Sequence, residues 1–212
     1  GYYVWWGGKN DLTPAQWGYE DYCTVKYRPK EPVKPMWRLD HQWEWRGAPG
    51  SDTYYSFYVG KLDTEGEQHY SAIDRSRLPE RLPTPTGWQG KPSLLKGIYE
   101  RQRLQTWTEE RWTELRATYY GMCTRLDYQF GLILEALRET GLYDDTAIFF
   151  FSDHGDFTGD YGLVEKTQNT FEDCLTRVPL IIKPPAGVPV KPRVSDALVE
   201  LIDFPATVEA LT

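Results

Sequence analysis

The chain has 212 residues, with 24 Lys and Arg against 31 Asp and Glu, and therefore a net charge of −7. General binding to nucleic-acid backbones requires a basic surface, so this charge argues against a nucleic-acid-binding protein. Aromatic residues make up 15% of the chain and hydrophobic residues 40%, which is enough for a packed core and excludes disorder of the whole chain.

The longest strongly apolar runs, residues 147–151 and 178–182, are far shorter than the roughly 20 residues of a membrane-spanning helix. We therefore expect no membrane span. The first residues show no signal-peptide pattern and no initiator Met, so we expect the sequence to start inside a longer protein. Cys23, Cys123 and Cys174 are odd in number and widely spaced, which argues against a disulfide framework and is consistent with a reducing compartment such as the cytoplasm.

In chain order, the first predicted element is a short strand over residues 2–6, which ends at a pair of glycines. Residues 13–50 are rich in aromatic residues and proline without a clear period, which predicts irregular structure. A second short strand is predicted over residues 56–59. Residues 74–96 carry four prolines, and we expect an extended connector there rather than a helix.

The clearest predicted element is a helix over residues 109–140, where apolar residues recur at spacings of three and four. Thr106 and Glu109 form a capping-box pattern at its start, and Gly141 is a natural left-handed stop at its end. The continuous apolar runs at 146–151 and 178–183 predict strands buried on both faces, as in a parallel sheet.

Residues 196–201 and 204–211 have helical patterns after the second buried strand. The order of helix, buried strand, long loop, buried strand and helix is typical of an α/β fold. We therefore expect a mostly parallel sheet flanked by helices.

The sequence Ser152-Asp153-His154-Gly155-Asp156 follows the first buried strand, and ligands in open α/β sheets bind beyond the carboxyl ends of strands. Asp153 and His154 offer an oxygen and a nitrogen donor for a divalent cation, although Ca²⁺ or Mg²⁺ would need further oxygens. Lys166 could neutralise an anionic substrate beside that cation. The same residues also fit an ordinary turn with capping carboxylates and a solvated lysine.

The stretch FFFSDHGDFTGDYGLVEK, residues 149–166, closely resembles the signature of the sulfatase family within the alkaline-phosphatase-like superfamily. Residues 132–141 resemble the family helix before that strand, residues 171–183 the next strand, and residues 194–207 the helix that follows. Residues 8–12, Gly-Lys-Asn-Asp-Leu, resemble the family segment Gly-Lys-Trp-His-Leu. The match is strong from about residue 110 onward and weak in the middle of the chain.

This resemblance implies that residues 1–212 are part of a single sulfatase-type α/β catalytic domain, incomplete at both ends. It implies hydrolysis of a sulfate ester by a formylglycine nucleophile and a divalent cation. Ca²⁺ is the expected cation, with Mg²⁺, Mn²⁺ and Zn²⁺ as alternatives. Asp153 and His154 match two metal ligands, Lys166 matches the lysine that contacts the sulfate, and Lys9 matches the lysine near the nucleophile.

The sequence also departs from the family pattern. None of the three cysteines lies in Cys-x-Pro-x-Arg, the motif that is oxidised to formylglycine, so the nucleophile, an early Asp pair and a smaller C-terminal domain are expected outside this chain. Asp11 stands where the family has His. The family's His-Pro-Pro segment is not visible, His69 is a poor substitute for it, and we expect an internal stretch to be missing near residue 70.

Two other functions stay open from the sequence. A phosphatase or phosphonate monoester hydrolase of the same superfamily would use the same Asp-His pair, and a transition metal would favour it. A non-catalytic protein could instead bind carbohydrate or a partner through its dense tryptophans, Trp5, Trp6, Trp37, Trp43 and Trp45. The expected substrate is a sulfated small molecule or carbohydrate, and the sequence does not predict an oligomeric state.

Overall fold

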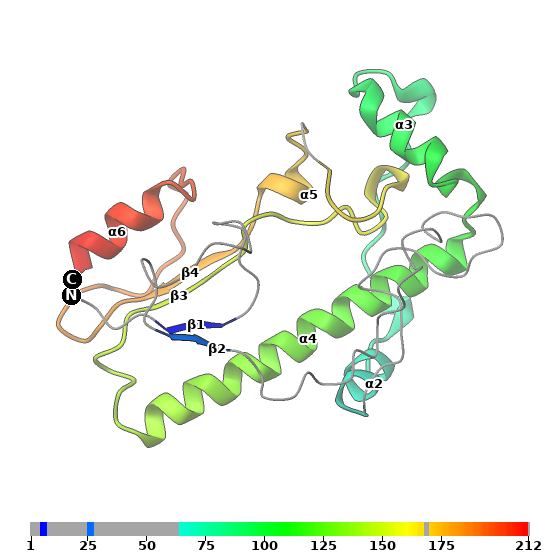
Figure 1. The fold of residues 1–212 in the computed structure, drawn as a ribbon. Coiled ribbons are helices and arrows are strands. Elements are labelled where there is room, and N and C mark those ends of the chain that lie inside the picture. The colour runs from blue at the N-terminus through cyan, green and yellow to red at the C-terminus, as the bar shows by residue number, and fades with distance from the viewer. Residues whose placement is uncertain (1–4, 8–24, 28–63, 168–169, 212) are drawn as a thin grey trace.

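The computed structural model describes residues 5–7, 25–27, 64–167 and 170–211. Its longest element is helix α4 (Glu109–Glu139), which crosses the whole molecule in Figure 1. Helix α2 (Thr64–Ser71) lies beside the first half of α4, and helix α3 (Ser93–Arg101) extends from the same end. Strands β3 (Ile148–Phe151) and β4 (Leu180–Lys183) lie beyond the other half, with helix α6 (Asp203–Leu211) next to them.

Helix α4 confirms the helix predicted from residue 109, but its cap differs from the prediction. Thr108 is the N-cap, and its side-chain oxygen accepts a hydrogen bond from the backbone N–H of Arg111 at 3.4 Å. The Thr106 hydroxyl instead donates to the carbonyl of Arg103 at 2.8 Å, because Thr106 still belongs to the preceding short 3₁₀ turn. Gly141 adopts a φ of +71°, which confirms the predicted left-handed stop.

The prediction that residues 74–96 contain no helix is wrong at the end of the segment. Pro92 occupies the N-cap of α3, and the helix begins at the next residue, Ser93. Proline is tolerated there because its missing N–H costs nothing before the first helical turn. Helix α2 was also not predicted. It packs closely on α4, where a Cβ added to Gly121 would lie 2.9 Å from the Cα of Tyr70.

The helix predicted over residues 196–201 is absent, whereas the one predicted over 204–211 is confirmed by α6. Leu198 is fully exposed and Val194 is 94% exposed. A short helix is marginal without an apolar face to bury, and these side chains contact no such face among the described residues.

The described strands form two pairs rather than one mostly parallel sheet, so the predicted parallel sheet is not confirmed. Strands β1 (Trp5–Gly7) and β2 (Val25–Tyr27) are parallel, with Trp5 opposite Val25. Strand β2 falls in a segment predicted to be irregular. Strands β3 and β4 are antiparallel, with Ile148 opposite Lys183. The strand predicted over residues 56–59 lies outside the described residues.

The aromatic side chains of β3 alternate between two helices. The rings of Phe149 and Phe151 each lie 5.0 Å from that of Phe204 in α6, whereas the ring of Phe150 lies 5.1 Å from that of Phe130 in α4. This alternation follows from the two-residue period of a strand. The prediction that both strands are buried on both faces is wrong: no residue of β3 or β4 is fully buried, and Phe151 and Ile181 are 39% and 63% exposed.

The described core lies away from these strands, around the loop that follows β3. Its buried side chains come from α3, the 3₁₀ turn Leu104–Thr106, α4, the loop and the short helix α5 (Asp173–Thr176). They are Leu95, Leu104, Trp112, Leu115, Phe157, Leu163, Val164 and Leu175. The loop that carries the predicted chemistry therefore contributes Phe157, Leu163 and Val164 to the described core.

No helix in the described part of the chain combines the length and the apolar character that crossing a membrane requires.

Candidate active site

The loop after β3 folds back on itself so that its two ends meet. The backbone N–H of Phe157 donates to the carbonyl of Glu165 at 3.0 Å, and that of Gly159 donates to Leu163 at 2.9 Å. Three of its non-glycine residues, Thr158, Tyr161 and Glu165, have φ angles of +47°, +57° and +62°. Each such conformation costs about 1–3 kcal/mol and persists only where the surroundings enforce it, and such residues cluster at functional sites.

This folding brings together three residues that the sequence analysis selected. The Lys166 ammonium nitrogen lies 2.7 Å from Nε2 of His154, twelve residues earlier in the chain. Oδ2 of Asp153 lies 3.7 Å from the same Nε2 atom. The Asp153 carboxylate is 78% exposed and the His154 side chain 40% exposed, so both face a region that a ligand can enter.

The hydrogen bonds of His154 indicate which ring nitrogen carries its proton. Nδ1 lies 2.8 Å from the carbonyl oxygen of Gly155, which can only accept a hydrogen bond. In a neutral imidazole, Nδ1 therefore holds the proton and Nε2 offers its lone pair to Lys166. A backbone carbonyl is one of the usual partners that fix the tautomer of a metal-binding histidine.

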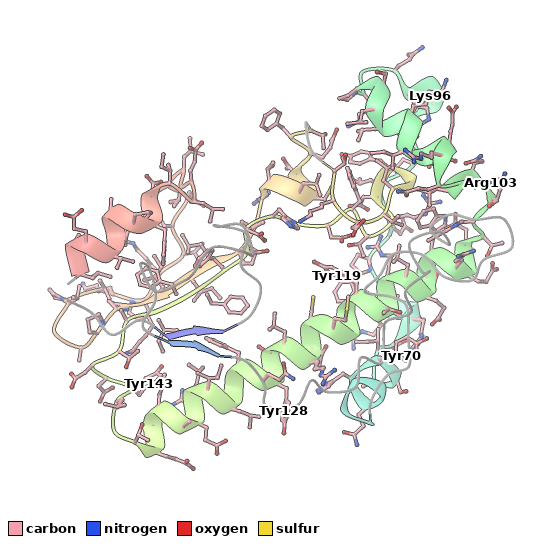
Figure 2. The ribbon with its side chains drawn as sticks, in the orientation of Figure 1. Tyr70, Lys96, Arg103, Tyr119, Tyr128 and Tyr143 are labelled. Atoms are coloured by element: carbon pink, nitrogen blue, oxygen red, sulfur yellow. The ribbon has the colours of Figure 1, made fainter. Side chains whose placement is uncertain are left out.

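The neighbouring Asp156 is a more buried carboxylate than Asp153. Burial raises the pKa of its carboxyl group, and hydrogen bonds from the backbone and side chain of Thr158 partly oppose that shift. Burial also raises the pKa of Tyr119 on α4 to about 12, with smaller contributions from Cys123 and Asp156. Tyr119 points from α4 toward the loop (Figure 2). Asp156, Tyr119 and Cys123 are therefore close enough for each to influence the pKa of another.

Helix α5 holds the beginning of the loop through Gly155. The backbone N–H of Gly155 donates to the carbonyl of Leu175 at 2.8 Å, and a Cβ at Gly155 would lie only 1.9 Å from the carbonyl oxygen of Cys174. Only glycine permits this approach. Because Gly155 also supplies the carbonyl that orients His154, the position of α5 is transmitted directly to the imidazole.

The other predicted site residue, Lys9, lies outside the described residues, as do Asp11 and Cys23. No group of three or more His, Cys, Asp or Glu side chains suited to a metal ion occurs in residues 5–7, 25–27, 64–167 and 170–211. Asp153 and His154 thus stand as a pair of donors within this range. Their carboxylate oxygen and imidazole lone pair lie close enough to face one cation, and their chemistry fits part of a divalent metal site.

The two described cysteines are free thiols. Burial raises the pKa of the Cys174 thiol to about 12, and it also raises that of Cys123, with Asp156 adding to the shift. Both therefore remain protonated near neutral pH, and a protonated thiol is a poor nucleophile.

Sequence reasoning missed the residues that hold this loop in place. Lys91 and Glu172 form an ion pair at 2.7 Å, although 81 residues separate them, and no local motif marks either one. It also missed a pocket of about 420 Å³ between the segment around Arg81 and the first turns of α4. Asp153, His154 and Lys166 do not line this pocket. Only the tertiary fold reveals these two features.

A family model described as "Sulfatase" matches residues 53–212 of this chain. The match covers well over half of the chain, and the chain belongs to the sulfatase family. This confirms the family resemblance seen in the sequence.

Characterised relatives agree with this assignment. The chain is 34% identical over 213 aligned residues to an arylsulfatase of Clostridium perfringens, with 95% of this chain and 39% of that protein covered. It is 42% identical to a choline-sulfatase of Rhizobium meliloti, over 39% of this chain and 16% of that protein. It is 37% identical to the multifunctional alkaline phosphatase superfamily protein PehA of Trinickia caryophylli, over 45% of this chain and 18% of that protein. The chain therefore spans well under half the length of these relatives.

Two solved structures are also similar over part of the chain. A phosphonate monoester hydrolase of Silicibacter pomeroyi matches with a TM-score of 0.47 and 28% identity, over 56% of this chain and 25% of that chain. The phosphonate monoester hydrolase of Agrobacterium radiobacter matches with a TM-score of 0.36 and 41% identity, over 39% of this chain and 16% of that chain.

Proposed function

We propose that this chain is part of the catalytic domain of a metal-dependent sulfatase, which hydrolyses a sulfate ester of a small molecule or carbohydrate. The observation that carries this proposal is the 2.7 Å approach of Lys166 to His154, beside Asp153, in a member of the sulfatase family. An ammonium group, an imidazole and a carboxylate gathered at one exposed loop suit an anionic substrate paired with a cation.

In this proposal Asp153 and His154 bind the divalent cation, for which Ca²⁺ is the first candidate. When bound, that cation would stabilise the negative charge on the sulfate oxygens. Ca²⁺ takes roughly 6–8 oxygen ligands, so further ligands would come from residues other than those described. The Nδ1–H···O=C bond to Gly155 supports the role of His154, because it leaves Nε2 unprotonated; a bound cation would take the lone pair that Nε2 offers to Lys166 in this structure.

Lys166 is proposed to contact the sulfate group and the leaving oxygen. Its position beside Nε2 supports this role, because a cation on His154 would turn the ammonium toward the anion that the cation binds. Lys9 is proposed to act near the nucleophile. The nucleophile itself is proposed to be a formylglycine from outside this chain, which agrees with the protonated state of Cys123 and Cys174.

The test measures hydrolysis of 4-nitrophenyl sulfate by the intact protein. Lys166→Met should lower kcat/KM by roughly 10²–10³-fold, the usual cost of one charge-stabilising group. Lys96→Met, at a lysine that is 52% exposed on α3, should leave the rate unchanged. Asp153→Asn should lower the metal content measured by mass spectrometry. An unchanged rate in Lys166→Met would overturn the role of Lys166, and full metal content in Asp153→Asn would overturn the metal site.

A second candidate is hydrolysis of phosphate or phosphonate monoesters. The similarity to the multifunctional alkaline phosphatase superfamily protein PehA, 37% identical over 45% of this chain, supports it. Phosphate and sulfate esters share their shape, and an Asp-His pair serves both. Parallel assays with 4-nitrophenyl phosphate and a phenylphosphonate monoester separate the two candidates. Turnover of these esters without turnover of any sulfate ester would favour the second.

A further inference from the structure

The carboxylate of Glu172 links three segments that are distant in the sequence. It accepts a hydrogen bond from the Lys91 ammonium group at 2.7 Å, and the two side chains are only 15% and 20% exposed. The Lys91 nitrogen also lies 4.0 Å from the centre of the Tyr161 ring. Glu172 thus joins the segment before α3, the loop between β3 and Lys166 (residues 152–166, the site loop) and the start of α5.

Tyr161 is the residue of the site loop that contacts the cluster of Lys91 and Glu172. Burial raises the pKa of its hydroxyl to about 12, and the hydrogen bond to Glu172 adds to the shift. Its φ of +57° is unusual for a tyrosine and needs enforcement by neighbours. Two neighbours on other segments provide it: the Lys91 ammonium group, paired with Glu172, lies over the ring, and the carbonyl of Leu82 accepts the backbone N–H of Tyr161 at 2.9 Å. The conformation of the loop before Lys166 therefore depends on the cluster.

Glu172 also begins helix α5. Glu172 is its N-cap, and its carbonyl accepts the backbone N–H groups of Leu175 at 2.8 Å and Thr176 at 3.1 Å. The carbonyl of Leu175 in turn accepts the N–H of Gly155, and the carbonyl of Gly155 orients His154. A continuous series of hydrogen bonds therefore runs from the backbone carbonyl of Glu172 to the imidazole, while the Glu172 side chain fixes the position of that backbone through Lys91.

We propose that Glu172 is a positioning residue, which through Tyr161 and helix α5 holds both ends of the site loop so that His154 and Lys166 meet. The expected loss of sulfate-ester hydrolysis rests on the proposed function. The expected change at the His154 ring does not. Glu172 touches neither His154 nor Lys166, and it acts through the loop. Lys91 completes the cluster by neutralising the half-buried carboxylate.

The test compares Glu172→Ala, Glu172→Gln and Gly121→Ala in the intact protein. Glu172→Gln keeps a side-chain oxygen that can accept from Lys91 and loses the charge, whereas Glu172→Ala removes the side-chain partner of Lys91 altogether. Both variants keep the Glu172 backbone carbonyl that begins α5. Gly121→Ala disturbs the contact of α4 with Tyr70, in a different part of the molecule, and controls for general destabilisation. The first readout is the ¹⁵N NMR spectrum of the histidine rings, which reports the His154 tautomer without any activity.

We expect Glu172→Ala to shift the His154 ring signals toward a mixture of tautomers, and Glu172→Gln to restore most of the wild-type spectrum. Gly121→Ala should leave those signals in place. In the sulfate-ester assay, kcat should fall at least tenfold in Glu172→Ala at temperatures where all variants are folded, with a smaller change in KM.

Unchanged His154 signals in Glu172→Ala would overturn the inference, as would equal changes in Gly121→Ala. If the wild-type protein hydrolyses no sulfate ester while Glu172→Ala still shifts the His154 tautomer, the proposed function fails and the positioning role stands. If the wild type is active and Glu172→Ala retains its full kcat, the positioning role fails and the proposed function stands.

Discussion

Gly155 provides the sharpest test of how the site loop is held. A Cβ at this position would lie 1.9 Å from the carbonyl oxygen of Cys174 and 3.2 Å from the Cα of Leu175. Both neighbours belong to the backbone of α5, so no side chain can rotate away. Reaching an ordinary contact of 3.4 Å requires a shift of about 1.5 Å between loop and helix.

The cost of Gly155→Ala follows from that shift. Overpacking of a well-packed site costs about 1–3 kcal/mol, and loss of the hydrogen bond from Gly155 to Leu175 about 1 kcal/mol more. We therefore expect the free energy of unfolding to fall by about 2–4 kcal/mol. Because a displacement of about 1 Å at a catalytic group can cost 100-fold in rate, kcat/KM should fall by a similar factor.

The assay is urea unfolding of the intact protein, followed by tryptophan fluorescence, with sulfate-ester hydrolysis measured in parallel. Gly131→Ala is the matched control, since no atom lies within 4 Å of its added Cβ and it sits inside α4. The control should be more stable than wild type by about 0.5–1 kcal/mol. A Gly155→Ala protein within 0.5 kcal/mol of wild type would refute this account of the loop, a threshold near the usual scatter of surface substitutions.

Three other predictions concern stability. Hydrogen bonds from Arg75, and secondarily from Tyr70, lower the pKa of Glu114 below its ordinary value of 4.5. The ionised carboxylate therefore stabilises the folded state fully above pH 4.5, and this stabilisation is lost as the pH falls through the lower pKa of the folded state. Glu114→Gln should therefore flatten the acid side of the stability curve in urea titrations, by under about 1 kcal/mol because the side chain is 48% exposed. Lys91→Met leaves the Glu172 carboxylate half-buried and unpaired and should cost about 2–3 kcal/mol in urea unfolding; a cost equal to that of the exposed Lys96→Met would contradict the ion pair's role. Thr108→Ala should cost about 0.5–1 kcal/mol in thermal unfolding, because it removes the α4 cap, and no change in melting temperature would count against that cap.

Local sequence patterns were sufficient wherever one segment contained the whole physical cause. The spacing of apolar residues predicted α4, and Gly141 predicted its end, because a helix and its stop are determined within a few neighbouring residues. The apolar runs also predicted β3 and β4. The run Asp153-His154 and the later Lys166 identified the site loop, because its glycines and turn residues encode the fold-back locally.

Patterns failed where a long-range partner decided the outcome. A six-residue apolar pattern at 196–201 predicted a helix that has no described surface to pack against, as the full exposure of Leu198 shows. The sequence pattern also could not predict that β4 runs antiparallel to β3, because an apolar run has the same composition in either orientation.

By itself, the sequence determined the family, the long helix and the residues gathered on one loop, since each of these rests on neighbouring positions in the chain. The tertiary structure decided what holds that loop in place. The 2.7 Å contact between Lys166 and His154 needs both ends of the loop to be anchored to α5 and to the segment before α3. Lys91 and Glu172 lie 81 residues apart, and only folding makes their pairing energetically relevant, because burial is what makes a lone carboxylate costly.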